Sequence, residues 1–142
     1  EDDNVQVQGV ETNNNSLGYF GFAYYVGHKD KMRAVPVLNS KNQPVGPSIE
    51  AVNNGSYQPL SRPLFIYVRD QAAQRPEIKE FIAVYLGEGG RLVKEVGYVP
   101  LPPQAYKLAL QHFNSSKLGT VFGGIPEVGV TIDALLAREG KL

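Results

Sequence analysis

The chain has 142 residues, of which 42% are apolar and 20% are charged, a composition typical of one folded globular domain. Acidic and basic residues balance at 14 each, so no net positive field attracts nucleic acid, and the absence of cysteine excludes disulfides, thiolate metal sites and cysteine nucleophiles. No apolar run is long enough to cross a bilayer. Because the chain opens at Glu1 without a methionine or a signal peptide, we expect a processed, truncated or cloned piece of a longer protein.

The N-terminal part combines a polar head with an apolar segment. Residues 1–16 are polar and end in a loop run of three asparagines and a serine, and their three valines suit either a short strand or a helix. Leu17–Phe22 is predicted to be a buried strand, with glycines where another backbone approaches closely. Ala23–Lys29 is expected to add a helical turn.

The middle of the chain alternates short strands and turns. Met32–Leu38 alternates as a strand does, and residues 39–44 have the composition of a turn. Ser48 is predicted to cap a short helix that runs through Val52 and is closed by Gly55.

The second half carries the strongest signals. Leu64–Val68 is the best predicted strand of the chain, and Pro76–Leu86 is the clearest helix because its apolar residues follow a helical stripe after an N-terminal proline. Further helices are expected from Gly90 and from Pro103, and Thr131 is expected to cap the last one. Three or so strands with four or five helices indicate an α/β fold.

Few residues have the pattern of a reactive site. His28 and His112 lack the spacing of metal ligands, and we interpret both as solvated. Arg62, in the run Ser61-Arg62-Pro63 before the predicted strand, has two interpretations. Its forked guanidinium suits an oxyanion, but a surface salt bridge at the start of a strand is the simpler interpretation of the pattern.

An ordered set of segments resembles the phosphate-binding proteins of bacterial ABC importers, in particular variants from cyanobacteria and related bacteria. The order and spacing agree over roughly residues 1–113, and the tail at residues 119–139 also looks like that of the cyanobacterial variants. The segments are Leu17–Tyr25 with its Gly-Tyr-x-Gly core, Val45–Tyr57, Pro59–Val68, Pro76–Phe81 and Gly97–Pro102.

The resemblance implies part of a two-lobed periplasmic-binding-protein fold, type II-like, of which this chain would be the C-terminal half only. Residues 1–16 would end the second lobe or form a linker. Residues 17–113 would be the C-terminal part of the first lobe, and residues 114–142 a glycine-rich connector and C-terminal helix. The family's Arg-x-x-x-Ser-Gly-Thr ligand segment is absent, so most phosphate ligands are expected upstream of Glu1.

The implied function is binding of inorganic phosphate outside the cytoplasmic membrane, in the periplasm or cell envelope, and delivery to the transmembrane permease subunits. We expect no enzymatic activity, cofactor or metal, because a phosphoesterase needs a metal cluster or an activated nucleophile. Tyr19, Ser61 and Arg62 are candidate cleft residues, and Gly18 and Gly21 are candidate hinge residues.

An alternative function is an interaction or assembly module without a ligand of its own. In that case the chain would pair with itself, or with the missing N-terminal part, through unpaired strand edges.

Overall fold

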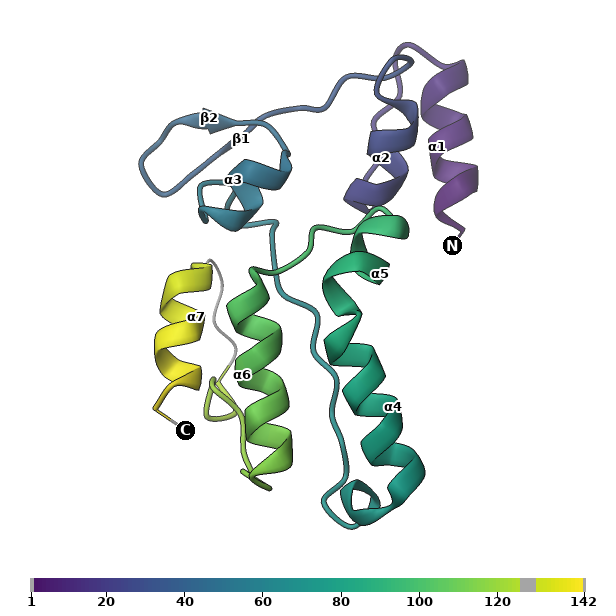
Figure 1. Ribbon diagram of the computed structural model, residues 1–142. Helices are drawn as coiled ribbons and strands as arrows, with labels where there is room; N and C mark the ends of the chain where they lie inside the picture. Colours follow the sequence, from purple (N-terminus) through teal and green to yellow (C-terminus); the bar gives the residue numbers. More distant parts are fainter. Residues whose placement is uncertain (1, 126–129, 142) are drawn as a thin grey trace.

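The computed structural model describes residues 2–125 and 130–141, and within them the chain is rich in helices and has one small sheet (Figure 1). In chain order the elements are α1 (Asp3–Thr12), α2 (Phe22–His28), β1 (Val37–Leu38), β2 (Pro44–Val45), α3 (Ile49–Asn53), the 3-10 helix η1 (Ala72–Gln74), α4 (Pro76–Gly87), α5 (Gly89–Glu95), α6 (Pro103–Asn114) and α7 (Ile132–Glu139).

The N-terminal valines belong to a helix. The carboxylate of Asp2 accepts a hydrogen bond from the Asn4 amide at 2.9 Å, which caps α1 and satisfies one of its free amides. α1 packs side by side with α2 in the upper part of the molecule (Figure 1).

The prediction of a buried strand at Leu17–Phe22 is wrong. Residues 17–21 form no regular structure and α2 begins at Phe22; the side chain of Leu17 is 85% exposed. A strand needs a neighbouring backbone for its hydrogen bonds, and no described segment lies alongside this one as a ladder partner.

The predicted strand Met32–Leu38 shortens to its last two residues. Val37 pairs with Val45 in a two-stranded antiparallel hairpin. The turn between the strands was predicted, and the side chain of Asn39 organises it by accepting hydrogen bonds from the amides of Lys41 and Gln43 at 2.9 and 3.0 Å.

The predicted capping signals are confirmed. The Ser48 hydroxyl accepts from the Ala51 amide at 3.0 Å at the start of α3, and Gly55 adopts a positive φ of 72° just after that helix. The Thr131 hydroxyl accepts from the Ala134 amide at 3.2 Å at the start of α7.

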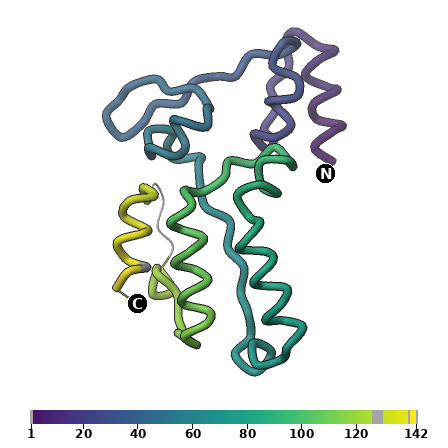
Figure 2. Tube along the Cα trace, in the orientation of Figure 1, coloured from purple at the N-terminus to yellow at the C-terminus, as the bar shows by residue number. Residues whose placement is uncertain are grey.

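The strand predicted at Leu64–Val68 is also not formed. Residues 61–69 run as an extended segment alongside α4, as the trace in Figure 2 shows, but have no strand partner among the described residues. Four of the five side chains from Leu64 to Val68 are exposed, with Tyr67 at 85%. The β propensity of these residues explains their extended conformation. A sheet would also need a second strand beside them, and the described residues place none there.

The lower part of the molecule is a layer of helices. α4 packs on α5 and α6, and α7 packs on α6. At the start of α5 the close approach of the Tyr106 ring requires glycine, because a Cβ on Gly89 would lie 2.8 Å from a ring carbon. The Tyr106 hydroxyl also accepts from the Leu101 amide at 3.2 Å, which holds the loop before α6.

The buried core is small. Among the described residues the buried apolar side chains are Val7, Ala51, Ile82 and Leu135, one each from α1, α3, α4 and α7. Many large apolar side chains remain exposed instead, which marks a surface that favours further packing. No helix in the described part of the chain is long and apolar enough to cross a membrane.

Candidate functional site

Tyr57 lies next to two of the sequence-predicted site residues, Tyr19 and Ser61. Tyr57 lies in the turn after α3, where its amide donates to the Ala51 carbonyl at 2.9 Å. The Ser61 hydroxyl donates to the Tyr57 carbonyl, and the Tyr19 phenol is close enough to affect the Tyr57 phenol electrostatically. The sequence reasoning missed Tyr57, because only the packing of the turn brings it to this place.

The Tyr57 phenol is held in its neutral form. Partial burial raises the pKa of the Tyr57 hydroxyl, and repulsion from the nearby Tyr19 phenolate adds to the rise. The Tyr57 hydroxyl therefore stays neutral, and remains a hydrogen-bond donor, up to a more alkaline pH than the hydroxyl of an exposed tyrosine.

Arg62 is exposed and follows directly on the anchored Ser61. In the described part of the chain no hydrogen bond or ion pair joins its guanidinium to another residue, so the salt bridge considered from the sequence is not formed there. A guanidinium without a carboxylate partner keeps its donors available for an oxyanion.

The roles of Ser61 and Arg62 differ chemically. Ser61 donates its single hydroxyl proton to the Tyr57 carbonyl, which ties it to the turn after α3. Arg62 and the largely exposed phenol of Tyr19 retain free donors toward solvent. The ligand-binding role of Tyr19, Ser61 and Arg62 stays a prediction.

The glycines of the expected hinge differ in their surroundings. A Cβ on Gly18 would lie 2.7 Å from Val10 Cγ2 and 2.8 Å from Phe20 Cε1, so two side chains crowd this glycine, and not the neighbouring backbone that was predicted. At Gly21 the nearest atom would be a Tyr24 ring carbon at 3.6 Å, an ordinary contact. The strand that was to carry the hinge is absent, and the hinge role of both glycines stays a prediction.

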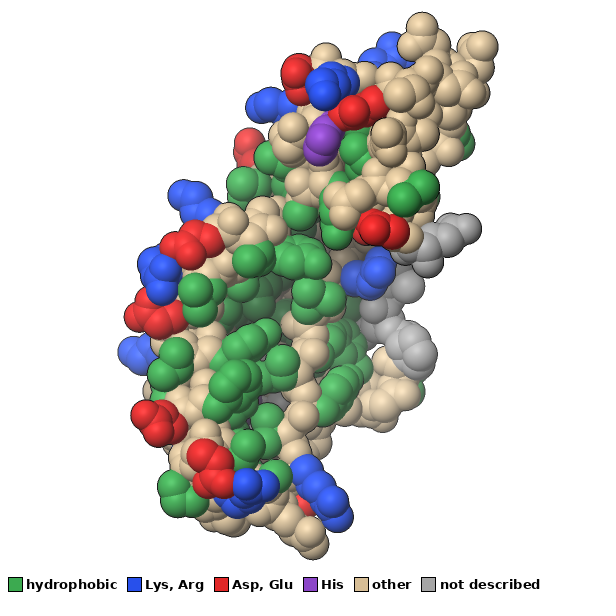
Figure 3. Space-filling model, turned by 90° about the vertical axis from the view of Figure 1, so that its right-hand side faces the viewer, with side chains coloured by type: hydrophobic (Ala, Val, Ile, Leu, Met, Phe, Trp, Pro, Cys, Tyr) green, Lys and Arg blue, Asp and Glu red, His purple; other side chains and the backbone are tan. Residues whose placement is uncertain are grey.

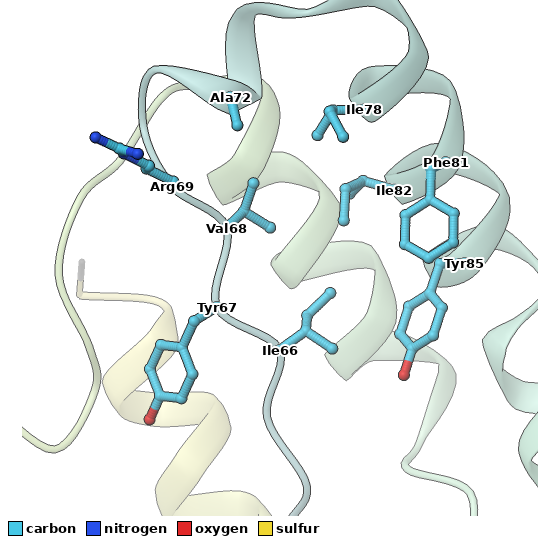
Figure 4. A pocket seen from close by; sticks show the side chains of 9 residues that line it. All are labelled: Ile66, Tyr67, Val68, Arg69, Ala72, Ile78, Phe81, Ile82 and Tyr85. Carbon is cyan, nitrogen blue, oxygen red and sulfur yellow. The ribbon is translucent and has the colours of Figure 1, made fainter.

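An open apolar groove lies between the extended segment and α4. Its volume is about 440 Å³, and Figure 3 shows apolar side chains gathered over a hollowed face of the molecule. In Figure 4 the side chains of Ile66 and Val68 point toward α4, whereas Tyr67 and Arg69 point to the other side, the alternation expected of a strand. The lining residues are Ile66, Tyr67, Val68, Arg69, Ala72, Ile78, Phe81, Ile82 and Tyr85.

His28 is not simply solvated, as the sequence interpretation had it. Its Nδ1 lies 2.5 Å from Glu11 Oε1, and Lys31 Nζ lies 3.6 Å from the other carboxylate oxygen. These contacts tie the end of α2 to the end of α1. No group of three or more histidines, cysteines or acidic residues able to hold a metal occurs among the residues that the structure describes.

Known proteins resemble this chain over three quarters of its length or more. It is 49% identical over 140 residues to Protein SphX of Synechococcus elongatus, which covers 99% of this chain and 42% of SphX. It is 38% identical over 107 residues to the phosphate-binding protein PstS of Staphylococcus haemolyticus, covering 75% of this chain and 34% of PstS. The chain thus spans well under half the length of these curated relatives.

A solved structure has a similar fold. A crystal structure described as a possible phosphate binding protein from Planctomyces limnophilus superimposes with a TM-score of 0.67 at 38% identity, covering 82% of this chain and 42% of that one. The expectation that the chain is part of a periplasmic-binding-protein fold is thereby confirmed. No family model matches the sequence.

Proposed function

Since the chain is homologous to SphX and to phosphate-binding PstS proteins over a minority of their length, we propose that it forms the C-terminal part of the substrate-binding component of a phosphate ABC importer. The complete protein would bind inorganic phosphate outside the cytoplasmic membrane and deliver it to the transmembrane permease subunits. Its role would be binding rather than catalysis. The observation that carries the proposal is this likeness to proteins whose names state phosphate binding.

Within this proposal the chain contributes few phosphate ligands. The Arg-x-x-x-Ser-Gly-Thr segment is absent, and the larger part of the relatives' length lies outside the match. Arg62 is the candidate, because it follows directly on Ser61 beside Tyr57 and, like Arg33 and Arg69, its guanidinium has no carboxylate partner in the described part of the chain. Tyr19 would be a neutral donor, and Ser61 would orient the loop that carries Arg62.

A chimera tests the proposal. The stretch of Synechococcus elongatus SphX that matches this chain is replaced by residues 1–142, and phosphate binding is measured by calorimetry beside the parent SphX. We expect stoichiometric phosphate binding by both proteins, weakened by Arg62→Ala in the chimera and unchanged by Arg33→Ala as a matched control. A folded chimera that does not bind phosphate, beside a parent that does, would contradict the proposal.

The isolated chain provides the complementary measurement. With most ligands outside the matched stretch, we expect calorimetry of the 142-residue chain to show weak phosphate binding or none. A stoichiometric isotherm at micromolar concentration would show that the chain carries the main ligand set itself.

The apolar groove supports a second candidate function, self-association through the extended segment. No backbone hydrogen bond joins Leu64–Val68 to another described residue, and the segment contains no charged side chain. A second copy of this chain suits it, because the chain has no net charge to repel its copy and each copy offers both an unpaired backbone edge and a groove.

Light scattering across a wide concentration range tests this candidate. We expect a mass that rises with concentration in the wild-type chain and stays monomeric in Ile66→Lys, which puts a charge into the groove. Val35→Lys serves as the control, since Val35 is exposed away from the groove lining. A clean wild-type monomer throughout would exclude self-association.

A further inference from the structure

Phe122 and α7 with its cap Thr131, together called the C-terminal segment, contact the chain on both sides of the loop that carries Ser61 and Arg62. Before this loop, Thr131 packs against Gly55, where a Cβ would lie only 2.7 Å from Thr131 Cγ2. After the loop, the rings of Phe65 and Phe122 meet edge to face with their centroids 5.4 Å apart. The two contacts therefore enclose residues 56–64.

The C-terminal segment is itself anchored in the body of the protein. Leu135 of α7 is 6% exposed and is one of the few buried apolar side chains in the described part of the chain, and α7 packs on α6. The guanidinium of Arg138 lies over the Phe122 ring at 5.9 Å, so both Arg138 and Phe65 contact Phe122. An anchored segment can restrain the loop that it touches.

The contact between Gly55 and Thr131 depends on the positive φ of Gly55 and on its lack of a side chain. Gly55 has a φ of 72°, a conformation in which a side chain is strained, and the absent Cβ leaves room for the Thr131 methyl group. Thr131 has a second task, since its hydroxyl caps α7 through the Ala134 amide. One residue thus joins the start of α7 to the start of the loop.

We propose that the C-terminal segment, through Thr131 and Phe122, is a positioning element that holds residues 56–64 and so sets the direction in which Arg62 is presented. The start of the loop is held by hydrogen bonds from Ser56 and Tyr57 to the Ala51 carbonyl, but the part that carries Arg62 is not. Residues 60–64 make no backbone hydrogen bond with other described residues, and the Ser61 hydroxyl bond to Tyr57 stays within the loop. The restraint itself is independent of the proposed function, whereas its consequence for anion binding rests on that function.

Backbone relaxation by NMR tests the restraint in the 142-residue chain without phosphate. We expect the amide order parameters of Leu60, Ser61 and Arg62 to fall from the rigid range of about 0.85 to below about 0.6 in Phe122→Ala. The order parameters in α4 should not change. Leu118→Ala, which truncates a side chain that is 75% exposed, is the control and should leave the loop as in the wild type.

Thr131→Ser separates the contact from the helix cap. Serine keeps the hydroxyl that caps α7 but lacks the methyl group that packs on Gly55, so the loop should loosen while the amides of α7 stay ordered. If Phe122→Ala fails to fold, Thr131→Ser alone still tests whether the C-terminal segment restrains the loop. Unchanged loop order parameters in Thr131→Ser, with α7 intact, would overturn the proposal.

The phosphate chimera separates this inference from the proposed function. Phe122→Ala in the chimera should weaken phosphate binding by roughly tenfold, the equivalent of about 1.4 kcal/mol. If the loop loosens in relaxation measurements but phosphate affinity is unchanged, the restraint stands and the role of Arg62 in anion binding is refuted.

Discussion

Replacing Leu135 by alanine tests whether α7 belongs to the folded core. The side chain of Leu135 is 6% exposed, so the change removes three buried carbons, and at about 0.8 kcal/mol for each buried methylene the transfer cost alone is about 2.4 kcal/mol. The cavity that is left adds to this cost, but α7 lies at the edge of the molecule and can partly collapse onto α6. We therefore expect a loss of about 2.5–3.5 kcal/mol in the free energy of unfolding.

Urea unfolding followed by far-ultraviolet circular dichroism measures this loss, because most of the regular structure is helical. Leu118→Ala is the matched control: the same atoms are removed from a side chain that is 75% exposed, and a change within about 0.5 kcal/mol is expected. If the two variants lose the same free energy of unfolding, α7 does not contribute to the core and the burial argument for Leu135 is wrong.

Two further predictions concern the N-terminal half. Gly18→Val should lower the free energy of unfolding by about 1–3 kcal/mol, because the new Cβ meets Val10 and Phe20. Gly9→Ala, in α1 with open space around it, is the control and should raise the free energy of unfolding by about 0.5–1 kcal/mol. Equal effects of the two variants in urea unfolding would refute the crowding at Gly18. Because folding raises the pKa of Tyr57, its contribution to stability is fully present below about pH 10 and is lost as the pH rises further. Tyr57→Phe should reduce this alkaline loss in urea titrations relative to Tyr98→Phe, and an identical pH profile for the two variants would contradict the raised pKa.

The helices and their caps follow from the sequence alone. Pro76 begins α4, Ser48 and Thr131 cap their helices through the predicted hydroxyl oxygens, and Gly55 ends the α3 turn with a positive φ. These features depend on residues within a few positions of one another, which is why local chemistry is sufficient to predict them. The resemblance to phosphate-binding proteins was also visible in the order of short segments, and homology to SphX over 99% of the chain and to PstS over 75% of it confirms the resemblance.

The strands could not be predicted in the same way. Leu64–Val68 has the composition of a strand and runs extended, yet forms no ladder among the described residues, and Leu17–Phe22 divides into an exposed loop and the start of α2. A strand exists only with its neighbour, so its formation depends on distant backbone that composition does not reveal.

The candidate site was likewise decided by tertiary structure. From the sequence Arg62 was either an anion ligand or a salt-bridge partner, and only the packing shows that no carboxylate of the described residues reaches it. The same packing brings Tyr19 close to Tyr57, and it brings Thr131 and Phe122 to the two ends of the loop. Contacts between residues so far apart in the chain leave no periodicity or spacing in the sequence, because they depend on how the helices and loops pack rather than on how each one forms.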